Sequence, residues 1–264
     1  MAGLCHCPAR VLPRSRSDRI ARRLRLHGRL LHQPCPATDV SMEPIAHIRS
    51  AFPAKFGIPR QAGLVPDLVA SVVFEPHYRN PDAIRGIEDF SHIWLIWQFS
   101  AAIRDDWRPT VRPPRLGGEQ RLGVFATRSP FRPNPIALSS VRLLEVRSEP
   151  DLGPVLVVGG ADLMDGTPIF DIKPYIAADL HTDATFGFTT RNTDYRVQVD
   201  ISDELIARVP EKLRDGLLGV LAEDPRPAYQ DDPERNYGLG FAGLNVRFRV
   251  AAGVLTVVEI EPLV

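Results

Sequence analysis

The chain has 264 residues, of which 44% are hydrophobic and 24% charged, and its formal net charge is zero. This composition is that of an ordinary soluble globular protein with one large or two modest domains, and it excludes disorder throughout. Because neither sign of charge is in excess overall, a nucleic-acid partner can be inferred only from a local basic patch.

The first 41 residues differ in composition from the rest of the chain. They carry eight Arg and no Lys, and they hold all three cysteines, so the body has no disulfide framework. The segment lacks the apolar core of a secretory signal, and Cys5-His6-Cys7 has only Cys35 as a further ligand, which does not make a zinc site. We expect residues 1–41 to be an Arg-rich leader upstream of the true start at Met42, with a disordered arm as the alternative.

After Met42, short β-like runs alternate with Pro and Gly, which is typical of a strongly curved, mainly β structure. The expected strands are Ile45–Arg49, Leu68–Phe74, Ile93–Phe99, Leu122–Thr127, Ile136–Arg147, Val155–Val158, Thr167–Ile172 and Tyr195–Val199. Asn80 fits the N-cap of a helix over Pro81–Asp89. The longest apolar run, Ile93–Phe99, is far shorter than the roughly 20 residues that span a bilayer, so no membrane segment is expected.

A second change in composition follows Tyr175. Residues 176–193 are polar and loop-like, and beyond them the pattern indicates a small α+β domain. Its expected elements are a capped helical region and two strands: Ser202–Ala222, Leu244–Val250 and Val254–Ile260. We therefore predict one domain over residues 42–190 and a second over residues 191–264.

One motif is misleading. Gly238–Gly243 fits the dinucleotide pattern G-x-G-x-x-G, but that interpretation needs a strand before the motif and a helix after it. Here a strand, Leu244–Val250, follows, so a flexible hairpin is the better interpretation. Neither a Ser/His/Asp order nor a zinc-protease motif is convincing, and hydrolysis has little support.

Between Arg104 and Arg132 the chain carries seven Arg against three acidic residues, interleaved with Trp107, Phe125 and Phe131. Guanidinium groups match the geometry of phosphate, and aromatic rings can stack on unpaired bases. This stretch is the best local candidate for an RNA-binding surface. On composition alone, a solvated loop with ion pairs is the alternative.

Several segments are richer in Pro, Gly and Arg than a simple scaffold requires. They are Ile58–Gln61, Phe90–His92, Trp107–Gly118, Gly123–Ile136 and Asp165–Pro168 with its continuation Asp171–Tyr175. Proline fixes backbone angles, so such loops can hold donors and acceptors in place for a ligand. Tight corners between strands are the alternative for any one segment.

In order and spacing, these segments resemble the TrmO/TsaA (YaeB) family of small β-barrel methyltransferases, and Asp224–Tyr229 extends the match, which covers about residues 43–264. The resemblance implies an S-adenosylmethionine-binding β-barrel without a Rossmann element, a small α+β C-terminal domain, and a cytoplasmic homodimer. It also implies N6-methylation of threonylcarbamoyl-adenosine beside the anticodon of tRNA. The alternatives are a methyltransferase of the same fold for another RNA or a small molecule, and a non-catalytic RNA-binding module.

The resemblance also implies which residues bind the cofactor. They are Arg60, Gln61, Ser100, Ala101, Arg128, Leu138, Asp165, Gly166, Thr167 and Pro168. In chemical terms, Leu138 suits adenine, Asp165 suits the ribose hydroxyls, and Arg128 or Arg60 suits the methionine carboxylate. Ser100 is a departure, since family members commonly have His there, and its shorter side chain would need a water to replace an imidazole hydrogen bond.

Methyl transfer from a sulfonium is an in-line displacement, so the protein mainly has to align the reactants and exclude water. The accepting nitrogen is of the ureido type and benefits from a base, for which His92 and Asp171 are candidates; a purely structural role is the alternative for both. Among Arg112, Arg115 and Arg132, one could clamp the carboxylate of the substrate RNA. No metal is expected.

Overall fold

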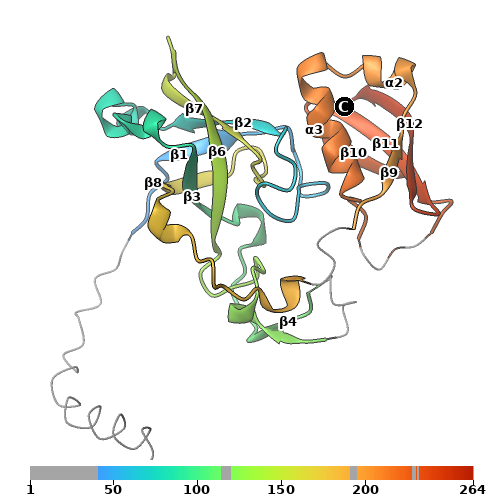
Figure 1. Cartoon of the computed structure of the whole chain (residues 1–264), viewed down its shortest axis with the longest axis horizontal. Coiled ribbons are helices and arrows are strands. Elements are labelled where there is room, and N and C mark those ends of the chain that lie inside the picture. The colour runs from blue at the N-terminus through green and yellow to red at the C-terminus, as the bar shows by residue number, and fades with distance from the viewer. Residues whose placement is uncertain (1–40, 114–119, 191–194, 228–229, 231, 264) are drawn as a thin grey trace, which may run out of the picture. The chain divides into compact units, whose positions relative to one another are not determined.

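A computed structural model of the chain describes residues 41–113, 120–190, 195–227, 230 and 232–263 (Figure 1). The expected leader, Arg115 and Tyr229 therefore lie outside the described residues. The described part is mainly β, as the sequence predicts. Its helices are all too short or too polar to cross a membrane.

The N-terminal strands form one sheet that closes on itself. Its members, in the order in which they pair, are β1 (Ala46–Arg49), β2 (Val69–Phe74), β7 (Gly153–Gly159), β6 (Ile136–Glu149), β3 (His92–Gln98) and β8 (Pro168–Pro174). Strand β8 pairs in turn with β1, and all six pairings are antiparallel. In the register, Ile96 of β3 lies opposite Leu138 of β6 on one side and Asp171 of β8 on the other.

Alternation of burial explains why these segments become strands. In β3, Ile93, Leu95 and Trp97 are buried, while the residues between them are partly exposed. This period of two places one face of the strand in a core, which it shares with Val141, Leu156 and other apolar residues. The core therefore lies inside the closed sheet.

Two local predictions are wrong in their details. The segment Leu122–Thr127 forms a strand only at β5 (Leu122–Gly123), which pairs with β4 (Thr110–Val111), and then turns into a short 3₁₀ helix. The carbonyl of Val124 accepts from the backbone and the hydroxyl of Thr127, so a local turn replaces the sheet pairing. Similarly, Pro81–Asp89 is two 3₁₀ helices, separated at Gly86, whose φ of +84° a right-handed helix cannot accommodate. Asn80 nevertheless caps the first of them, as predicted.

The short 3₁₀ helices lie in the connections between strands. They are η1 (Pro76–Tyr78), η2 (Pro81–Ile84), η3 (Ile87–Asp89), η4 (Ser100–Ala102), η6 (Val124–Ala126), η7 (Ala177–Asp179) and η8 (Gly187–Thr190). Two of them, η4 and η6, carry residues of the candidate site described below.

The C-terminal segment is a four-stranded sheet with two helices. The strands, in pairing order, are β10 (Tyr237–Phe241), β11 (Leu244–Ala251), β12 (Val254–Pro262) and β9 (Gln198–Asp200), and the helices are α2 (Asp203–Ala207) and α3 (Glu211–Ala222). Ser202 caps α2 as expected, with its hydroxyl accepting from the amide of Leu205. Strands β10 and β11 pair as a hairpin through the turn at Ala242–Gly243, so the hairpin interpretation of the G-x-G-x-x-G pattern is confirmed.

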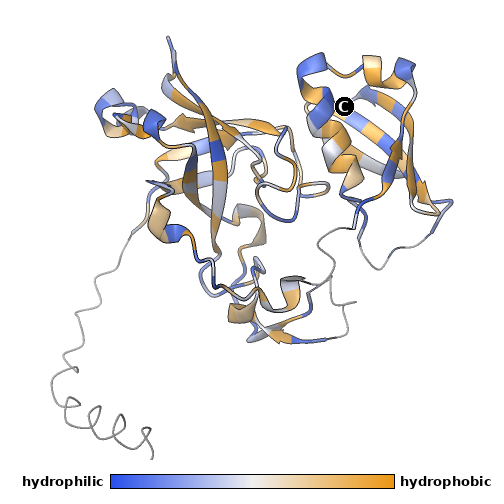
Figure 2. Ribbon diagram, in the orientation of Figure 1, coloured by the Kyte–Doolittle hydropathy of each residue, from blue (hydrophilic) through white to orange (hydrophobic). Residues whose placement is uncertain are grey.

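Residues 51–68, which follow β1 in the chain, pack against this C-terminal sheet. Phe52 meets Phe241 edge to face with ring centroids 5.7 Å apart, and the amide of Ala242 donates to the carbonyl of Ala51 at 2.7 Å. Val65 and Leu68 belong to the same buried cluster as the apolar face of α3. Hydrophobic residues alternate with hydrophilic ones along α3 and the strands of this sheet (Figure 2), as expected for elements that cover a core on one side.

Candidate functional site

Two segments predicted to bind a cofactor meet at Arg128. Its Nη1 donates a hydrogen bond to the side-chain oxygen of Gln61 at 2.5 Å. Arg128 lies just beyond η6, and Gln61 lies in the long connection between β1 and β2. Since the side chains of Arg60 and Arg128 are both exposed, two cations face solvent close to one another.

The predicted turn Asp165–Pro168 is attached to the end of β1. The amide of Ser50 donates to Asp165 Oδ1 at 2.9 Å, and the amide of Asp165 donates to the carbonyl of Phe52 at 2.8 Å. Gly166 has a φ of +73°, and a Cβ at this position would meet no atom within 4 Å. The side chain of Thr167 is buried and bonds the carbonyl of Met164, so it shapes the turn from inside. The carboxylate of Asp165 and the open turn are therefore presented to solvent in a fixed geometry.

Ser100, Ala101 and Leu138 lie at one edge of the closed sheet. Ser100 and Ala101 form η4 just after β3, and Leu138 is near the start of β6. Because β3 and β6 are antiparallel neighbours, the end of one and the start of the other meet, and the amide of Phe99 bonds the carbonyl of Pro135 at 2.8 Å. Leu138 is 48% exposed, which is unusual for Leu in a strand and suits contact with an apolar ligand.

An acidic residue that sequence reasoning missed connects these segments. Asp162 Oδ1 accepts from Ser139 Oγ at 2.6 Å, and Ser139 Oγ accepts from Trp97 Nε1 at 2.9 Å. The amide of Ala62 also bonds the Asp162 carboxylate. The only signal in the sequence is a lone charge within the otherwise apolar run that ends at Leu163.

Burial raises the pKa of Asp162 above its ordinary value. The hydrogen bonds from Ser139 and from the amides of Asp162 and Ala62 oppose this change in pKa, as does the positive charge of Arg128. Among the carboxyl groups of the described residues for which a shift is resolved, this is the only one whose pKa is raised. Perturbed carboxyl groups of this kind concentrate at functional sites.

Of the two candidate bases, His92 lies apart from this group, whereas Asp171 is opposite Ile96, which is itself opposite Leu138. His92 starts β3, on the order of 20 Å from the far end of the strand at 3.3–3.4 Å per residue. Its ring bonds Ser91 Oγ at 2.9 Å and contacts the ring of Tyr175. Asp171 is paired with Lys173 at 2.8 Å. A catalytic role for either residue stays a prediction that none of these contacts supports.

Exposed aromatic rings and Arg side chains do gather in the predicted RNA-binding stretch. The rings of Trp107 and Phe125 lie 6.0 Å apart, and 71% of Phe125 is exposed. The guanidinium of Arg104 lies over Phe131 at 3.8 Å, and that of Arg132 lies over Phe125 at 5.9 Å. A pocket of about 290 Å³ adjoins these rings, lined by Phe125, Arg132, Pro133, Asn134 and Ile136. In the described part of the stretch, Arg therefore stacks on aromatic rings.

Arg112 and Arg132, predicted to contact substrate, differ in their surroundings. Arg112 is exposed just after β4. Arg132 Nη1 donates to the carbonyl of Thr127 at 2.8 Å and so holds the loop that carries Arg128. Arg132 therefore has a structural contact that the sequence did not indicate.

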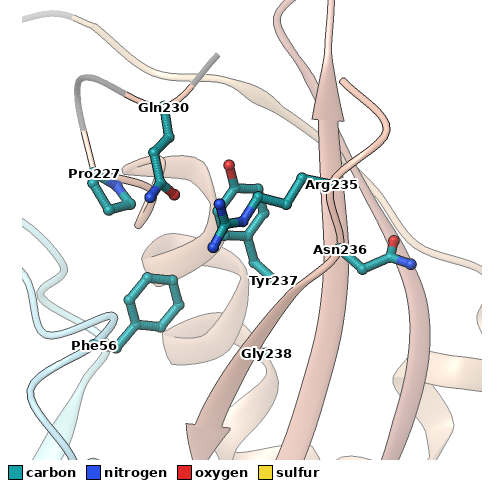
Figure 3. Close-up of a pocket in the computed structure, with 7 residues that line it drawn as sticks. All are labelled: Phe56, Pro227, Gln230, Arg235, Asn236, Tyr237 and Gly238. Atoms are coloured by element: carbon teal, nitrogen blue, oxygen red, sulfur yellow. The ribbon is translucent and has the colours of Figure 1, made fainter. Parts of the chain in front are cut away.

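A second pocket lies on the C-terminal segment and is lined by Phe56, Pro227, Gln230, Arg235, Asn236, Tyr237 and Gly238 (Figure 3). The Arg235 guanidinium lies over the ring of Tyr237 at 5.4 Å. The hydroxyl of Tyr237 is buried and has no hydrogen-bond partner among the described residues. Neither of the two pockets is lined by the residues predicted to bind the cofactor.

Next to this second pocket, Asp224 and Arg226 form a buried ion pair. Arg226 Nε and Nη2 donate to the two carboxylate oxygens at 2.9 Å each, and the hydroxyl of Tyr195 donates to Asp224 Oδ2 at 3.0 Å. Burial acts to raise the pKa of Asp224, but the bonds from Arg226 and Tyr195 outweigh it and lower the pKa. The Asp224–Tyr229 motif is therefore, in its described part, a closed ion-pair network.

In the part of the chain that the structure describes, no three His, Cys, Asp or Glu side chains are grouped so as to hold a metal ion.

Comparisons with known proteins give one family for both halves of the chain. Residues 47–180 match the model of the tRNA-methyltransferase O N-terminal domain, and residues 194–263 match that of the TrmO C-terminal domain. A tRNA (adenine(37)-N6)-methyltransferase of Escherichia coli (strain K12) is 42% identical over 235 residues, which is 85% of this chain and 99% of that protein. A putative S-adenosylmethionine-dependent methyltransferase, RcsF, of Pseudomonas aeruginosa is 41% identical over 79% of this chain and 91% of its own length.

Among solved structures, the crystal structure of TrmO from Pseudomonas aeruginosa is similar with a TM-score of 0.69 and 33% identity, over 85% of this chain and 100% of that one. Similarity in both sequence and structure therefore extends across most of the chain.

Proposed function

Because the chain belongs to the tRNA-methyltransferase O family, we infer that it transfers a methyl group from S-adenosylmethionine to N6 of an adenosine beside the anticodon of tRNA. The relatives' names support the reaction and the cofactor. The structural observation that carries the proposal is that Arg128 bonds Gln61 at 2.5 Å and that the carboxylate of Asp162 bonds Ser139, the neighbour of Leu138, at 2.6 Å. We further propose that the adenosine already carries a threonylcarbamoyl group.

The chemistry of this residue set fits the proposed cofactor, which is a zwitterion with an adenine at one end and a sulfonium that supplies the methyl group. Arg128 or Arg60 would bind its carboxylate, since charge-assisted bonds to Arg are strong and directional. Asp165 would accept from the ribose hydroxyls, and the exposed Leu138 would cover the adenine. The open turn at Gly166 leaves room for a ligand to approach the backbone.

What this protein must supply to the transfer is mainly alignment. The transfer is accelerated mainly by positioning, when the accepting nitrogen is held in line with the methyl group in a site closed to water. The rigid attachment of the Asp165 turn to β1 and of Arg128 to Gln61 supports this role.

We propose that the aromatic and Arg-rich stretch 104–132 receives the anticodon loop. Unpaired bases stack on exposed rings, and each such contact contributes about 1–3 kcal/mol. The rings of Trp107 and Phe125 are exposed and side by side, and Arg104 and Arg132 lie against neighbouring rings. The body outside this stretch is acidic, so phosphate attraction would be confined to one region.

The contribution of Arg residues in stretch 104–132 to binding the phosphates of tRNA can be measured. Replacing Arg112 and Arg115 together by Ala should weaken tRNA binding and reduce the slope of log affinity against log salt by about 1–2 units, because each phosphate contact releases counterions. The measurement is a salt series of tRNA binding to the wild type and the double variant. Replacing Arg247 and Arg249 of β11 by Ala removes the same charge elsewhere and is the control. Equal slopes for the wild type and the Arg112/Arg115 variant would contradict phosphate contacts here.

The reaction itself is tested with purified protein, S-adenosylmethionine and one tRNA prepared with and without the threonylcarbamoyl group. Mass spectrometry of the digested nucleosides should show threonylcarbamoyl-adenosine heavier by one CH₂, and no methylated adenosine from the unmodified tRNA. Methylation of both tRNAs would remove the threonylcarbamoyl requirement. Methylation of neither, with the cofactor shown to bind, would contradict a tRNA substrate and favour another RNA or a small molecule.

We also propose that the protein acts in the cytoplasm as a homodimer. The exposed apolar side chains of Ile103 and Leu138 near the candidate site support a further surface that covers them. Sedimentation equilibrium decides between one and two copies of the 29.3 kDa chain.

A further inference from the structure

Asp162 contacts or adjoins several segments of the proposed cofactor site. Its carboxylate accepts from Ser139, the neighbour of Leu138, and from the amide of Ala62, the neighbour of Gln61. Through Ser139 it reaches Trp97, which ends the buried face of β3 just before Ser100 and Ala101. It also shares its loop with the turn at Asp165. Segments far apart in the sequence are thus held by one side chain.

Asp162 bonds a side chain on the buried face of strand β6. Ser139 is buried and Leu138 is exposed, so the two side chains lie on opposite faces of the strand. The carboxylate therefore acts from the inner side of β6, while Leu138, which is proposed to cover the adenine, lies on the outer side. This geometry favours a role in holding the site over direct contact with the reacting atoms.

A negative charge in this position reduces the stability of the folded state. The pKa of Asp162 is higher in the folded protein than in the unfolded chain, so the unfolded chain loses its proton at lower pH. Protonated Asp162 contributes to the stability of the folded state. This contribution is fully present below the pKa of Asp162 in the unfolded chain, and it is lost as pH rises through its pKa in the folded protein. Ionisation of this carboxyl is therefore less favourable in the folded protein than in the unfolded chain.

We propose that ionised Asp162 is a positioning residue for cofactor binding, holding the Arg60–Ala62 segment through the Ala62 amide and orienting Arg128 by its charge. The inference rests on the proposed function, because it presumes that these residues bind S-adenosylmethionine. Protonation removes the negative charge from the acceptor of the Ala62 bond and the attraction for Arg128. Cofactor affinity should therefore fall as pH falls through the pKa of Asp162.

Neighbouring hydrogen-bond donors and one charged side chain lower the pKa of Asp162. They are the Ser139 hydroxyl from β6, the amides of Asp162 and Ala62, and the single charged group, Arg128. Arg128 stays protonated throughout the acid range. In S-adenosylmethionine, the α-amino group also stays protonated, and the α-carboxyl group is ionised above about pH 4.5. Variants of Asp162 and Ser139 therefore test whether a change in affinity between pH 4.5 and 7 comes from the Asp162 carboxylate.

The experiment is calorimetric titration of the full chain with S-adenosylmethionine from pH 4.5 to 7, with melting recorded by circular dichroism at each pH. The wild type should bind about tenfold more weakly at the acid end, the value expected for losing about one charge-assisted hydrogen bond. Asp162→Asn should bind about tenfold more weakly at pH 7, with a flat profile. Asn keeps an acceptor for Ser139 but presents an NH₂ group to the amide of Ala62.

A second variant tests the assignment without removing the carboxylate. Ser139→Ala deletes a bond that lowers the pKa of Asp162, so the midpoint of the affinity profile should move to higher pH. Ser140→Ala changes the adjacent residue on the other face of β6 and should leave the midpoint unchanged.

The outcomes separate this inference from the proposed function. Absence of cofactor binding at every pH by folded wild-type protein would contradict the proposed function and the inference with it. Binding that does not depend on pH, or Asp162→Asn with the wild-type profile, would overturn the inference alone. Loss of melting temperature in Asp162→Asn at pH 7, with the affinity of the folded fraction unchanged, would also overturn it, because it indicates a structural role only.

Discussion

Replacing Arg128 by Ala should weaken the binding of S-adenosylmethionine by about 10- to 150-fold, because a charge-assisted hydrogen bond contributes about 1.5–3 kcal/mol. The guanidinium group is exposed and bonds Gln61 at 2.5 Å. Calorimetric titration at pH 7 measures the change directly. Because Arg128 also lowers the pKa of Asp162, its removal should shift the acid limb of the affinity profile to higher pH.

The matched control for Arg128 is Arg147→Ala. Arg147 is an exposed Arg near the end of β6, with Glu145 and Glu149 at 3.5 and 3.9 Å. Exposed pairs of this kind contribute about 0–1 kcal/mol, so neither stability nor affinity should change by more than that. If Arg128→Ala melts like the wild type and binds the cofactor equally well, Arg128 does not belong to the site.

Replacing Asp224 by Ala should lower the free energy of unfolding by about 3–5 kcal/mol, which corresponds to roughly 10 °C in melting temperature for a chain of this size. The substitution removes a buried carboxylate that bonds the guanidinium of Arg226 and accepts from the Tyr195 hydroxyl. Asp224 also has a φ of +50°, which Ala adopts less readily than Asp. Thermal and denaturant unfolding followed by circular dichroism measure the loss.

The control for Asp224 is an exposed ion pair, Arg85 with Asp82. Arg85→Ala should change the free energy of unfolding by about 1 kcal/mol or less. If the two variants lose the same stability, burial of the Asp224–Arg226 pair has no special effect and the argument from desolvation is wrong.

The two buried carboxyl groups should respond to pH in opposite directions. The pKa of Asp224 is below its ordinary value of 3.8, so its contribution to stability is fully present above that value and is lost as pH falls through the folded pKa. The gap in stability between the wild type and Asp224→Ala should therefore narrow only below about pH 4. For Asp162 the pKa is raised, and ionisation at higher pH lowers stability.

Much of the fold follows from local pattern. The apolar run Ile93–Phe99 and the aliphatic-rich segment that begins at Ile136 predict strands that the structure confirms. The prediction fails where local hydrogen bonds compete with pairing. At Val124–Ala126 a β-like composition forms a turn, because the hydroxyl of Thr127 and the guanidinium of Arg132 bind the carbonyls that a ladder would use.

The site was only partly predictable for a related reason. The resemblance to a family indicated Gln61, Arg128 and the Asp165 turn, and of these the structure brings Gln61 and Arg128 together. Asp162 has no sequence signature, since its role depends on bonds to Ser139 and Ala62 that only the closed sheet creates. His92 was named for its chemistry alone, and the contacts of its ring with Ser91 and Tyr175 are not specified by composition.

The packing of residues 51–68 against the C-terminal sheet has a consequence for synthesis. During translation this segment leaves the ribosome long before β10 and β11, whose Phe241 and Phe248 cover Phe52 and Phe56. Contacts between segments so distant in sequence form late and slow the overall folding rate. The connection that carries Arg60 and Gln61 should therefore lack part of its support on the nascent chain, and cofactor affinity should reach its full value only after the last strands are released.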